Sequence, residues 1–111
     1  MKFEIFKSEK NSKFYFNLKA KNGQVVLSSQ GYANKSGAKN GISSVQKNAS
    51  NMDCFETKLA KNGKHHFNLL SGNKQIIGSS QMYASKTSMD NGIKSVMRTS
   101  QEAEVVDLTT S

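Results

Sequence analysis

The sequence has only one cysteine, Cys54, only one arginine, Arg98, and no long hydrophobic run. A single cysteine excludes an internal disulfide and a cysteine-rich metal cage. No apolar stretch approaches the ~18 residues that cross a bilayer, and residues 2–7 alternate instead of forming the apolar region of a signal peptide. We therefore expect no membrane span and no secretory leader, and a cytoplasmic protein is the default prediction.

Acidic residues are also scarce, because 8 Asp and Glu face 16 Lys and Arg, which gives a net charge of +8. Three of the acids, Glu102, Glu104 and Asp107, lie in the last eleven residues, so positions 1–100 carry a net charge of +11. Such a charge attracts polyanions. However, lysine is a hydrated point charge and lacks the planar fork of arginine. The basic balance is therefore compatible with a polyanion-binding face and with a solvated lysine surface.

An internal repeat is the most informative feature that is present. Residues 16–49 align without a gap onto residues 67–100, so that Phe16-Asn17-Leu18 recurs as Phe67-Asn68-Leu69. Two copies at this spacing indicate two similar halves within one protein. A half of about 50 residues is near the lower limit for independent folding, so we expect the halves to bury apolar surface against each other.

Each half contains three strand patterns followed by one helix pattern. Alternation of period two predicts strands at residues 2–7, 13–19 and 24–28, and again at 55–58, 65–69 and 75–77. Apolar residues at helical spacing then form one stripe per repeat, which comprises Ala38, Ile42, Val45 and Ala49, and later Met89, Ile93 and Val96. Ser36 and Thr87 are the predicted N-caps, the second with Asp90 in a capping box. Gly41 and Gly92 lie inside the helices, which indicates close approach to the sheet or to the other helix.

The predicted fold class is α+β: two tandem β-β-β-α repeats form one antiparallel sheet with two helices packed on one face. We expect a single domain over residues 1–111. Repeat one spans 1–50, repeat two spans 52–100, and an acidic C-terminal tail spans 101–111. The expected state is a monomer with pseudo-twofold symmetry.

The repeated pattern Phe-x-Leu, Asn-Gly, Ser-x-x-Tyr and Gly-Ile-x-Ser-Val resembles the YegP-like family of small bacterial proteins over about residues 2–100. The resemblance implies a tandem β(3)-α fold with one continuous sheet and helices exchanged between the halves. It also implies that single-copy relatives reach the same structure as dimers, and it brings no activity with it. One departure is Lys74, which stands where the first repeat has Gly23 and leaves the type of the second turn open.

Residues with catalytic or metal-binding chemistry are few. His65 and His66 are adjacent, and neighbouring residues on a strand point to opposite faces, so the pair is unsuited to chelating one metal. Both align with aromatic residues of repeat one. Cys54 has no histidine motif beside it and is interpreted as a small structural residue. No duplicated carboxylate pair is visible in the aligned repeats. We therefore predict no catalytic residue, no metal site and no cofactor.

The Ser-Ser-Gln-x-Tyr block is the first candidate site, because it recurs where the third strand leads into the helix. It could form two symmetric pockets. Alternatively, its hydroxyls and amides satisfy the loop backbone while the tyrosine packs over the helix start, which is the favoured interpretation. The candidate residues are Ser29, Gln30, Tyr32, Ser80, Gln81 and Tyr83.

The sheet face away from the helices is the second candidate site. Aromatic rings among lysines there are typical of a stacking platform for single-stranded nucleic acid, although ordinary cross-strand pairs give the same pattern. The residues predicted on this face are Phe6, Tyr15, Asn17, Lys19, Lys58, His66, Asn68 and Leu70.

The sequence does not specify an activity, and the function it favours is a small non-enzymatic binding or interaction module. One alternative is weak, non-specific binding of single-stranded nucleic acid on the open sheet face, with the acidic tail competing for the same lysines. A less favoured alternative is a small enzyme that uses the Ser-Gln-Tyr pockets.

Overall fold

The computed structural model describes residues 1–109 of the protein. The strands are β1 Lys2–Lys7, β2 Phe14–Lys19, β3 Val25–Ser29, β4 Phe55–Leu59, β5 His65–Leu70, β6 Ile76–Ser80 and β7 Glu104–Asp107. The helices are α1 Lys35–Asn48 and α2 Lys86–Thr99, and short 3-10 turns cover η1 Met52–Cys54 and η2 Ser100–Glu102. Within the described residues, no helix is long and apolar enough to cross a membrane.

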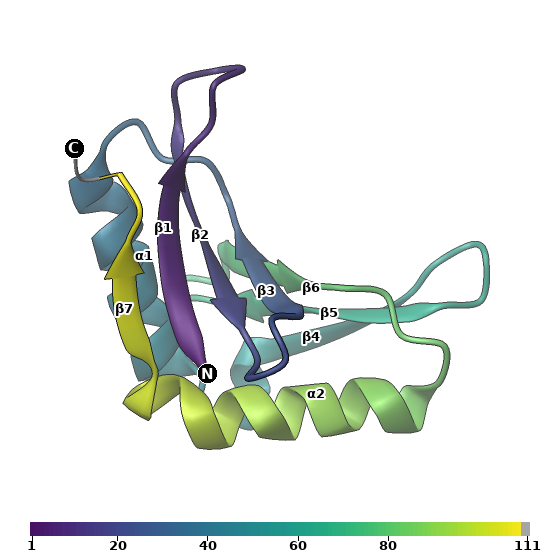
Figure 1. The fold of residues 1–111 in the computed structure, drawn as a ribbon. Coiled ribbons are helices and arrows are strands. Elements are labelled where there is room, and N and C mark those ends of the chain that lie inside the picture. Colours follow the sequence, from purple (N-terminus) through teal and green to yellow (C-terminus); the bar gives the residue numbers. More distant parts are fainter. Residues whose placement is uncertain (110–111) are drawn as a thin grey trace.

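All seven strands belong to one sheet, in the order β4-β5-β6-β3-β2-β1-β7. The two repeats meet where β3 pairs antiparallel with β6, with Leu27 opposite Ser80, Ser28 opposite Ser79, and Ser29 opposite Gly78. Because Ser28 and Ser79 are equivalent in the two repeats, the pseudo-twofold axis passes between them. The sheet twists so strongly that the β1–β2 hairpin and the β4–β5 hairpin extend in different directions (Figure 1).

Both helices lie on one face of this sheet, which confirms the predicted α+β architecture (Figure 1). Helix α1 packs on β1 and β2 of its own repeat and reaches β5 and β6 of the other, whereas α2 packs on β5 of its own repeat. The resemblance implied that the helices are exchanged between the repeats, and the structure differs from this. Helix α1 bridges the two repeats, whereas the main sheet contact of α2 is with its own repeat.

The predicted periodicities place the core correctly. Phe3, Ile5, Phe16 and Leu18 are fully buried on the helix side of β1 and β2. The helical stripes are buried against them, and the resulting cluster is continuous through both repeats. Burial of this shared apolar surface is the main force that holds the two repeats together.

The N-cap of each helix lies two residues before the one that the sequence predicts. Asn34 caps α1 by accepting a 2.8 Å hydrogen bond from the Gly37 amide, and Ser85 caps α2 by accepting one from Ser88 at 3.1 Å. Ser36 and Thr87 lie inside the first turns, so their assignment as caps is wrong. Asp90 forms an ion pair with Lys86 at 3.2 Å instead of a capping box.

The prediction of a purely antiparallel sheet is also wrong, because β7 pairs parallel with β1 and makes the sheet mixed. The extra strand comes from the segment interpreted as an acidic tail. In this segment Asp107 forms an ion pair with Lys35 at 3.0 Å. The acidic residue at its end therefore interacts with the start of α1.

The turn before β6 keeps the backbone of its counterpart despite its different sequence. Lys74 has a φ of 66°, in the left-handed region that Gly23 occupies with a φ of 84°. Non-glycine residues rarely adopt this conformation, so the turn geometry is imposed by the hairpin at some cost in strain.

Candidate functional site

The serines of the duplicated block stabilise the backbone where β3 and β6 leave the sheet. Ser29 Oγ accepts a hydrogen bond from the Phe16 amide at 2.8 Å and donates one to the Gln30 carbonyl at 2.8 Å. Ser80 repeats this arrangement with Phe67 at 2.9 Å and Gln81 at 2.8 Å. A hydroxyl that is engaged in this way completes the backbone hydrogen bonding of the loop, as the structural interpretation predicts.

The tyrosines of the block pack against the helices. Tyr32 stacks on Phe16 with ring centroids 6.2 Å apart, and Tyr83 stacks on Phe67 at 6.3 Å. Burial raises the pKa of both hydroxyls, and a hydrogen bond with the Gln81 side chain lowers that of Tyr83 in part. Each ring is also fastened through its backbone, because Tyr32 pairs with Phe14 and Tyr83 with His65.

The two helix glycines are explained by these rings. A Cβ at Gly41 would lie 2.8 Å from Cζ of Tyr32 and 2.8 Å from Cε2 of Phe16. A Cβ at Gly92 would lie 2.8 Å from Cζ of Tyr83. The close approach predicted from the sequence is therefore real, but it is made mainly to a tyrosine of the same repeat and not to the other helix.

The glutamines of the block differ between the repeats. Gln30 is exposed and, with Tyr32, lines a cavity of about 440 Å³ between α1 and the β5–β6 hairpin. Gln81 is partly buried beside the Tyr83 hydroxyl. The block therefore does not build two equivalent pockets.

The open face of the sheet carries a row of polar residues that crosses both repeats. Strand pairing aligns the row across six neighbouring strands, and the pseudo-twofold axis passes through its centre. The row comprises Glu4, Asn17, Ser28, Ser79, Asn68 and Glu56.

Hydrogen bonds and ion pairs organise this polar row. Asn68, only 7% exposed, accepts from Ser79 Oγ at 2.7 Å and donates to Glu56 at 3.3 Å. At the other end, Lys19 and Lys2 contact Glu4 at 2.8 and 3.3 Å. The hydrogen bond from Lys19 is the main reason that the pKa of Glu4 is lowered.

The sequence comparison missed that Glu4 and Glu56 are equivalent, so that one carboxylate recurs on the open face of each repeat, on β1 and on β4. Glu4 lies opposite Asn17, and Glu56 lies opposite Asn68. The first hairpin is one residue longer between its strands than the corresponding hairpin of repeat two, which shifts β1 out of the ungapped alignment. Counting outward from the two asparagines along the strands could have revealed the pair.

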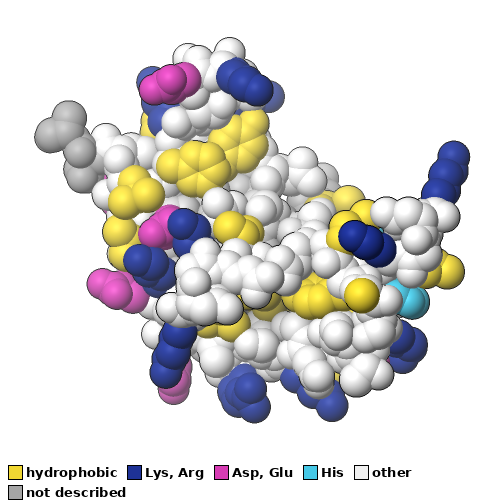
Figure 2. Space-filling model, turned by 45° about the vertical axis from the view of Figure 1, so that its right-hand side comes forward, with side chains coloured by type: hydrophobic (Ala, Val, Ile, Leu, Met, Phe, Trp, Pro, Cys, Tyr) yellow, Lys and Arg dark blue, Asp and Glu magenta, His cyan; other side chains and the backbone are white. Residues whose placement is uncertain are grey.

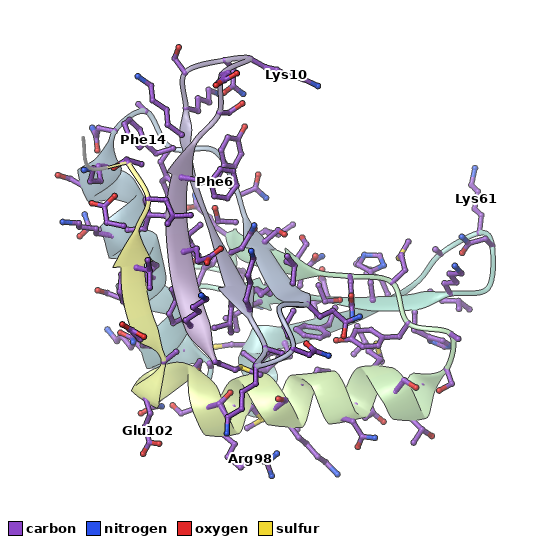
Figure 3. The ribbon with its side chains drawn as sticks, viewed as in Figure 1. Phe6, Lys10, Phe14, Lys61, Arg98 and Glu102 are labelled. Carbon is purple, nitrogen blue, oxygen red and sulfur yellow. The ribbon has the colours of Figure 1, made fainter. Side chains whose placement is uncertain are left out.

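An aromatic pair lies beside one end of the polar row. Phe6 and Tyr15 are opposite each other on β1 and β2 and stack with centroids 5.7 Å apart and planes 16° apart. The Tyr15 hydroxyl accepts a hydrogen bond from Asn11 Nδ2 at 2.9 Å. Phe6 points away from the ribbon below the hairpin tip that carries Lys10 (Figure 3).

Lys58 and His66 occupy the corresponding places in repeat two. The ring of His66 is partly buried, and its Nδ1 is buried without a hydrogen-bond partner within the described residues. The other residues considered for chemistry have structural surroundings. His65 pairs with Tyr83 through the backbone at 2.8 and 2.7 Å, and Cys54 Sγ lies 3.8 Å from Asn48 Oδ1.

The structure thus separates the sequence-predicted residues into two groups. The serines and tyrosines of the repeated block are structural supports of the helix–sheet junction. Tyr15, Asn17 and Lys19 on β2 and His66 and Asn68 on β5 lie on the open face, as expected from their alternation, with β3 and β6 between the two sets.

Comparison with known proteins gives one consistent family. The profile of the domain of unknown function (DUF1508) matches residues 9–56 and again residues 60–107. A UPF0339 protein of Shewanella oneidensis is 50% identical over 107 residues, which cover 96% of each chain. The UPF0339 protein YegP of Escherichia coli K12 is 47% identical over 107 residues, again with 96% of each chain covered.

Solved structures agree with this assignment. The solution NMR structure of the Shewanella oneidensis UPF0339 protein has a TM-score of 0.90 and covers 96% of this chain and 90% of its own. That of yegP from E. coli has a TM-score of 0.91 at 45% identity and covers 99% and 94%. The yegP protein is described as one of unknown function. The resemblance seen in the sequence is confirmed: the chain belongs to the DUF1508 family, together with the YegP-like UPF0339 proteins.

Proposed function

We propose that this protein is a non-enzymatic binding module that holds single-stranded nucleic acid weakly, and without strong sequence preference, at the aromatic pair Phe6–Tyr15. The observation that carries the proposal is a stacked, half-exposed aromatic pair on an open sheet face. Every base has a flat face that can stack on such a ring, so binding needs no readout of base edges. A cytoplasmic location is part of the proposal.

The surroundings of the pair supply positive charge. Lys10 and Lys13 belong to the same hairpin, which carries Glu9 as its one acid between the strands. The Lys13 side chain lies beside the Tyr15 hydroxyl, because a Cβ at Gly31 would be 3.0 Å from an atom of each. Lys7 is on the opposite face of the hairpin, where its ammonium lies 5.6 Å from the centroid of the Phe14 ring. Hydrophobic side chains gather beneath basic and acidic side chains near the top of the face drawn in Figure 2. A nucleotide stacked on Tyr15 would therefore have lysines within reach of its phosphates.

The distribution of charge explains why we propose weak binding. Lys2 and Lys19 are paired with Glu4, and Lys58 is paired with Glu56 at 3.6 Å. On the face drawn in Figure 2, the Lys and Arg side chains are scattered and do not gather in one patch. Binding then rests on the few lysines of the β1–β2 hairpin and on base stacking.

A binding role is favoured over catalysis because the candidate nucleophiles are engaged in structure. Both serine hydroxyls accept a backbone amide and donate to a backbone carbonyl. Both tyrosine hydroxyls lie against helix glycines. An enzyme built on this block would have to break the helix–sheet junction in order to react.

Fluorescence anisotropy with a labelled single-stranded oligonucleotide tests the proposal. Tyr15→Ala should weaken binding by about 1–3 kcal/mol, because it removes one stacking contact. With about two phosphates neutralised, affinity should fall roughly sevenfold between about 50 and 200 mM salt. The matched control is His66→Ala, which alters the equivalent position of repeat two and should leave affinity within about twofold.

Folding of each variant must be checked by circular dichroism before affinities are compared. Equal losses in Tyr15→Ala and His66→Ala would show that the aromatic pair is not the site. An absence of binding at low salt would remove nucleic acid as the ligand and leave a binding module for another partner.

A further inference from the structure

The two ends of the sheet differ in whether their outer edge is covered. β7 pairs with β1 along one end, so that Phe3 and Ile5 are fully buried. β4 is the last strand at the other end. On it Thr57 and Leu59 are exposed, and Leu59 is 68% accessible. An unpaired strand edge presents backbone donors and acceptors to any extended chain that can reach them.

The covered end shows what kind of segment such an edge accepts. Strand β7 has the sequence Glu-Val-Val-Asp, and the Leu108 amide donates to the Ile5 carbonyl at 2.9 Å. Asp107 forms an ion pair with Lys35 at the start of α1. Val105 lines a cavity of about 230 Å³ together with residues of α1. An acidic, valine-containing segment is thus held by backbone pairing and an ion pair to a lysine, with a valine at an apolar cavity beside the helix.

Each of these three elements has a counterpart at β4. Phe55 lies opposite Leu69 as Phe3 lies opposite Leu18, so Thr57 corresponds to Ile5. The Ile5 carbonyl points to the outer edge, and the amide and carbonyl of one strand residue share a direction, so those of Thr57 point outward too. Lys86 occupies the place of Lys35 at the start of α2, and its 74% exposed side chain forms an ion pair with Asp90 at 3.2 Å, for which a carboxylate of an added segment would compete.

The apolar contact also has an unfilled counterpart. A groove of about 300 Å³ lies between β4 and α2 and is lined by Met52, Phe55, Thr57, Asp90, Ile93 and Lys94. Ile93 is equivalent to Ile42, which lines the cavity beside Val105. Met52 is 53% exposed at the groove. A β-branched side chain on an added strand would lie at this groove as Val105 lies at the cavity beside α1.

We propose that the outer edge of β4 binds an extended acidic segment of a partner protein, with β-branched apolar residues between its carboxylates, by parallel strand addition. The segment would extend the sheet by one strand, with its backbone bonded to Thr57, an apolar side chain in the groove and a carboxylate on Lys86. The positive net charge of the protein favours an acidic partner over a neutral one.

The probe for the test is a synthetic peptide with residues 102–109 of this chain, fluorescein-labelled at its N-terminus and titrated with the full-length protein. We expect saturable binding. In 15N-labelled protein the shifted amide signals should be those of β4 and the first turn of α2, with β1 unchanged. A peptide with serine at both valine positions should bind at least tenfold more weakly.

Two protein variants locate the site. Thr57→Pro removes an outward amide without breaking the pairing of β4 with β5 and should weaken binding at least tenfold, whereas Thr57→Val keeps the amide and should bind within twofold of the native chain. Lys86→Glu should weaken binding about tenfold. Its charge-matched control, Lys61→Glu, lies at the tip of the β4–β5 hairpin and should bind within twofold (Figure 3). If Thr57→Pro fails to fold, the comparison of peptide affinity between Lys86→Glu and Lys61→Glu tests the proposal.

Four results would overturn the proposal. The first is no saturable binding at millimolar peptide. The second is undiminished binding of the peptide by Thr57→Pro and Lys86→Glu. The third is a set of signal shifts in β1, which would show that the peptide exchanges with β7. The fourth is self-association of the protein that Thr57→Pro abolishes, because the edge would then serve a second copy of this chain.

Discussion

Strands β1 and β4 hold equivalent places in the two repeats, yet their surroundings differ. Phe3 and Ile5 are inaccessible, whereas Phe55 is partly exposed and Thr57 is exposed. Both strands pair antiparallel with the next strand and in the same register, because Glu4 lies opposite Asn17 and Glu56 lies opposite Asn68. One difference is β7, which pairs with β1 at one end of the sheet and has no counterpart beside β4 within the described residues.

The chain order explains why the two ends differ. Each family match contains two strands, a helix and the beginning or whole of the following strand, which is β4 in the first match and β7 in the second. β4 occupies the place beside β5. The corresponding place beside β2 is already taken by β1, so β7 adds outside β1 in parallel orientation. A duplicated sequence therefore need not produce duplicated pairing, because a strand position can be filled only once.

The open face shows the same division into shared and individual features. The polar row from Glu4 to Glu56 is symmetric about the junction of β3 and β6. The aromatic pair Phe6–Tyr15 occurs in repeat one, and Lys58 and His66 replace it in repeat two. The repeats thus share the features that support the fold and differ in the residues proposed to bind a ligand.

The largest effect is expected when the two repeats are separated. Residues 1–50 alone should not form a stable monomer, because β3 loses its pairing with β6 and the continuous core is cut. Circular dichroism during heating and sedimentation equilibrium measure this. Association of the fragment through β3 would agree with a shared core, whereas a stable monomeric fragment would contradict it.

The helix glycines compare the two repeats directly. Gly41→Leu and Gly92→Leu should each destabilise the protein by about 2–3 kcal/mol, because the added side chain meets a tyrosine ring. The loss should be larger at Gly41, where Phe16 is a second close neighbour. Urea unfolding measures both, with Ser43→Ala on the exposed side of α1 as the control for helix propensity. Stabilisation by either leucine would show that the ring moves aside freely.

Removal of β7 should make the two ends of the sheet alike. Truncation after Glu102 should destabilise the protein by about 1–2 kcal/mol, since two half-exposed valines and one row of strand hydrogen bonds are lost. Hydrogen exchange at the Ile5 amide should accelerate towards the rate at Thr57. Unchanged exchange at Ile5 would mean that β7 does not protect this edge.

The smallest effect concerns the pH dependence of the ion pair that fastens β7. Hydrogen bonds from Thr109 and Lys35 lower the pKa of Asp107 from 3.8 to about 2. A carboxylate with a lowered pKa stabilises the folded state above its unfolded pKa, and this contribution is lost as the pH falls from about 4 to about 2. Asp107→Asn should flatten the stability profile in this window, measured by urea unfolding. An identical acid profile for both proteins would exclude a role for Asp107.

The sequence by itself determined the elements whose signal is periodic and local. Alternation in residues 13–19 identified Phe16 and Leu18 as core residues, and the stripe that contains Ile42 and Val45 identified the buried side of α1. Recurrence of the same patterns established two repeats in one sheet. These predictions hold because the period of a strand or helix decides which side chains face the core.

Only the tertiary structure decided the features that depend on distant partners. β7 has four residues, two of them acidic, and its partner β1 lies at the opposite end of the chain, so no local period reveals it. The equivalence of Glu4 and Glu56 depends on hairpin length and strand register, and the need for Gly41 depends on where the Tyr32 ring packs. Pairing and packing select among positions that local sequence leaves equally available, which is why the sequence determined the repeat and the three-dimensional fold decided its asymmetry.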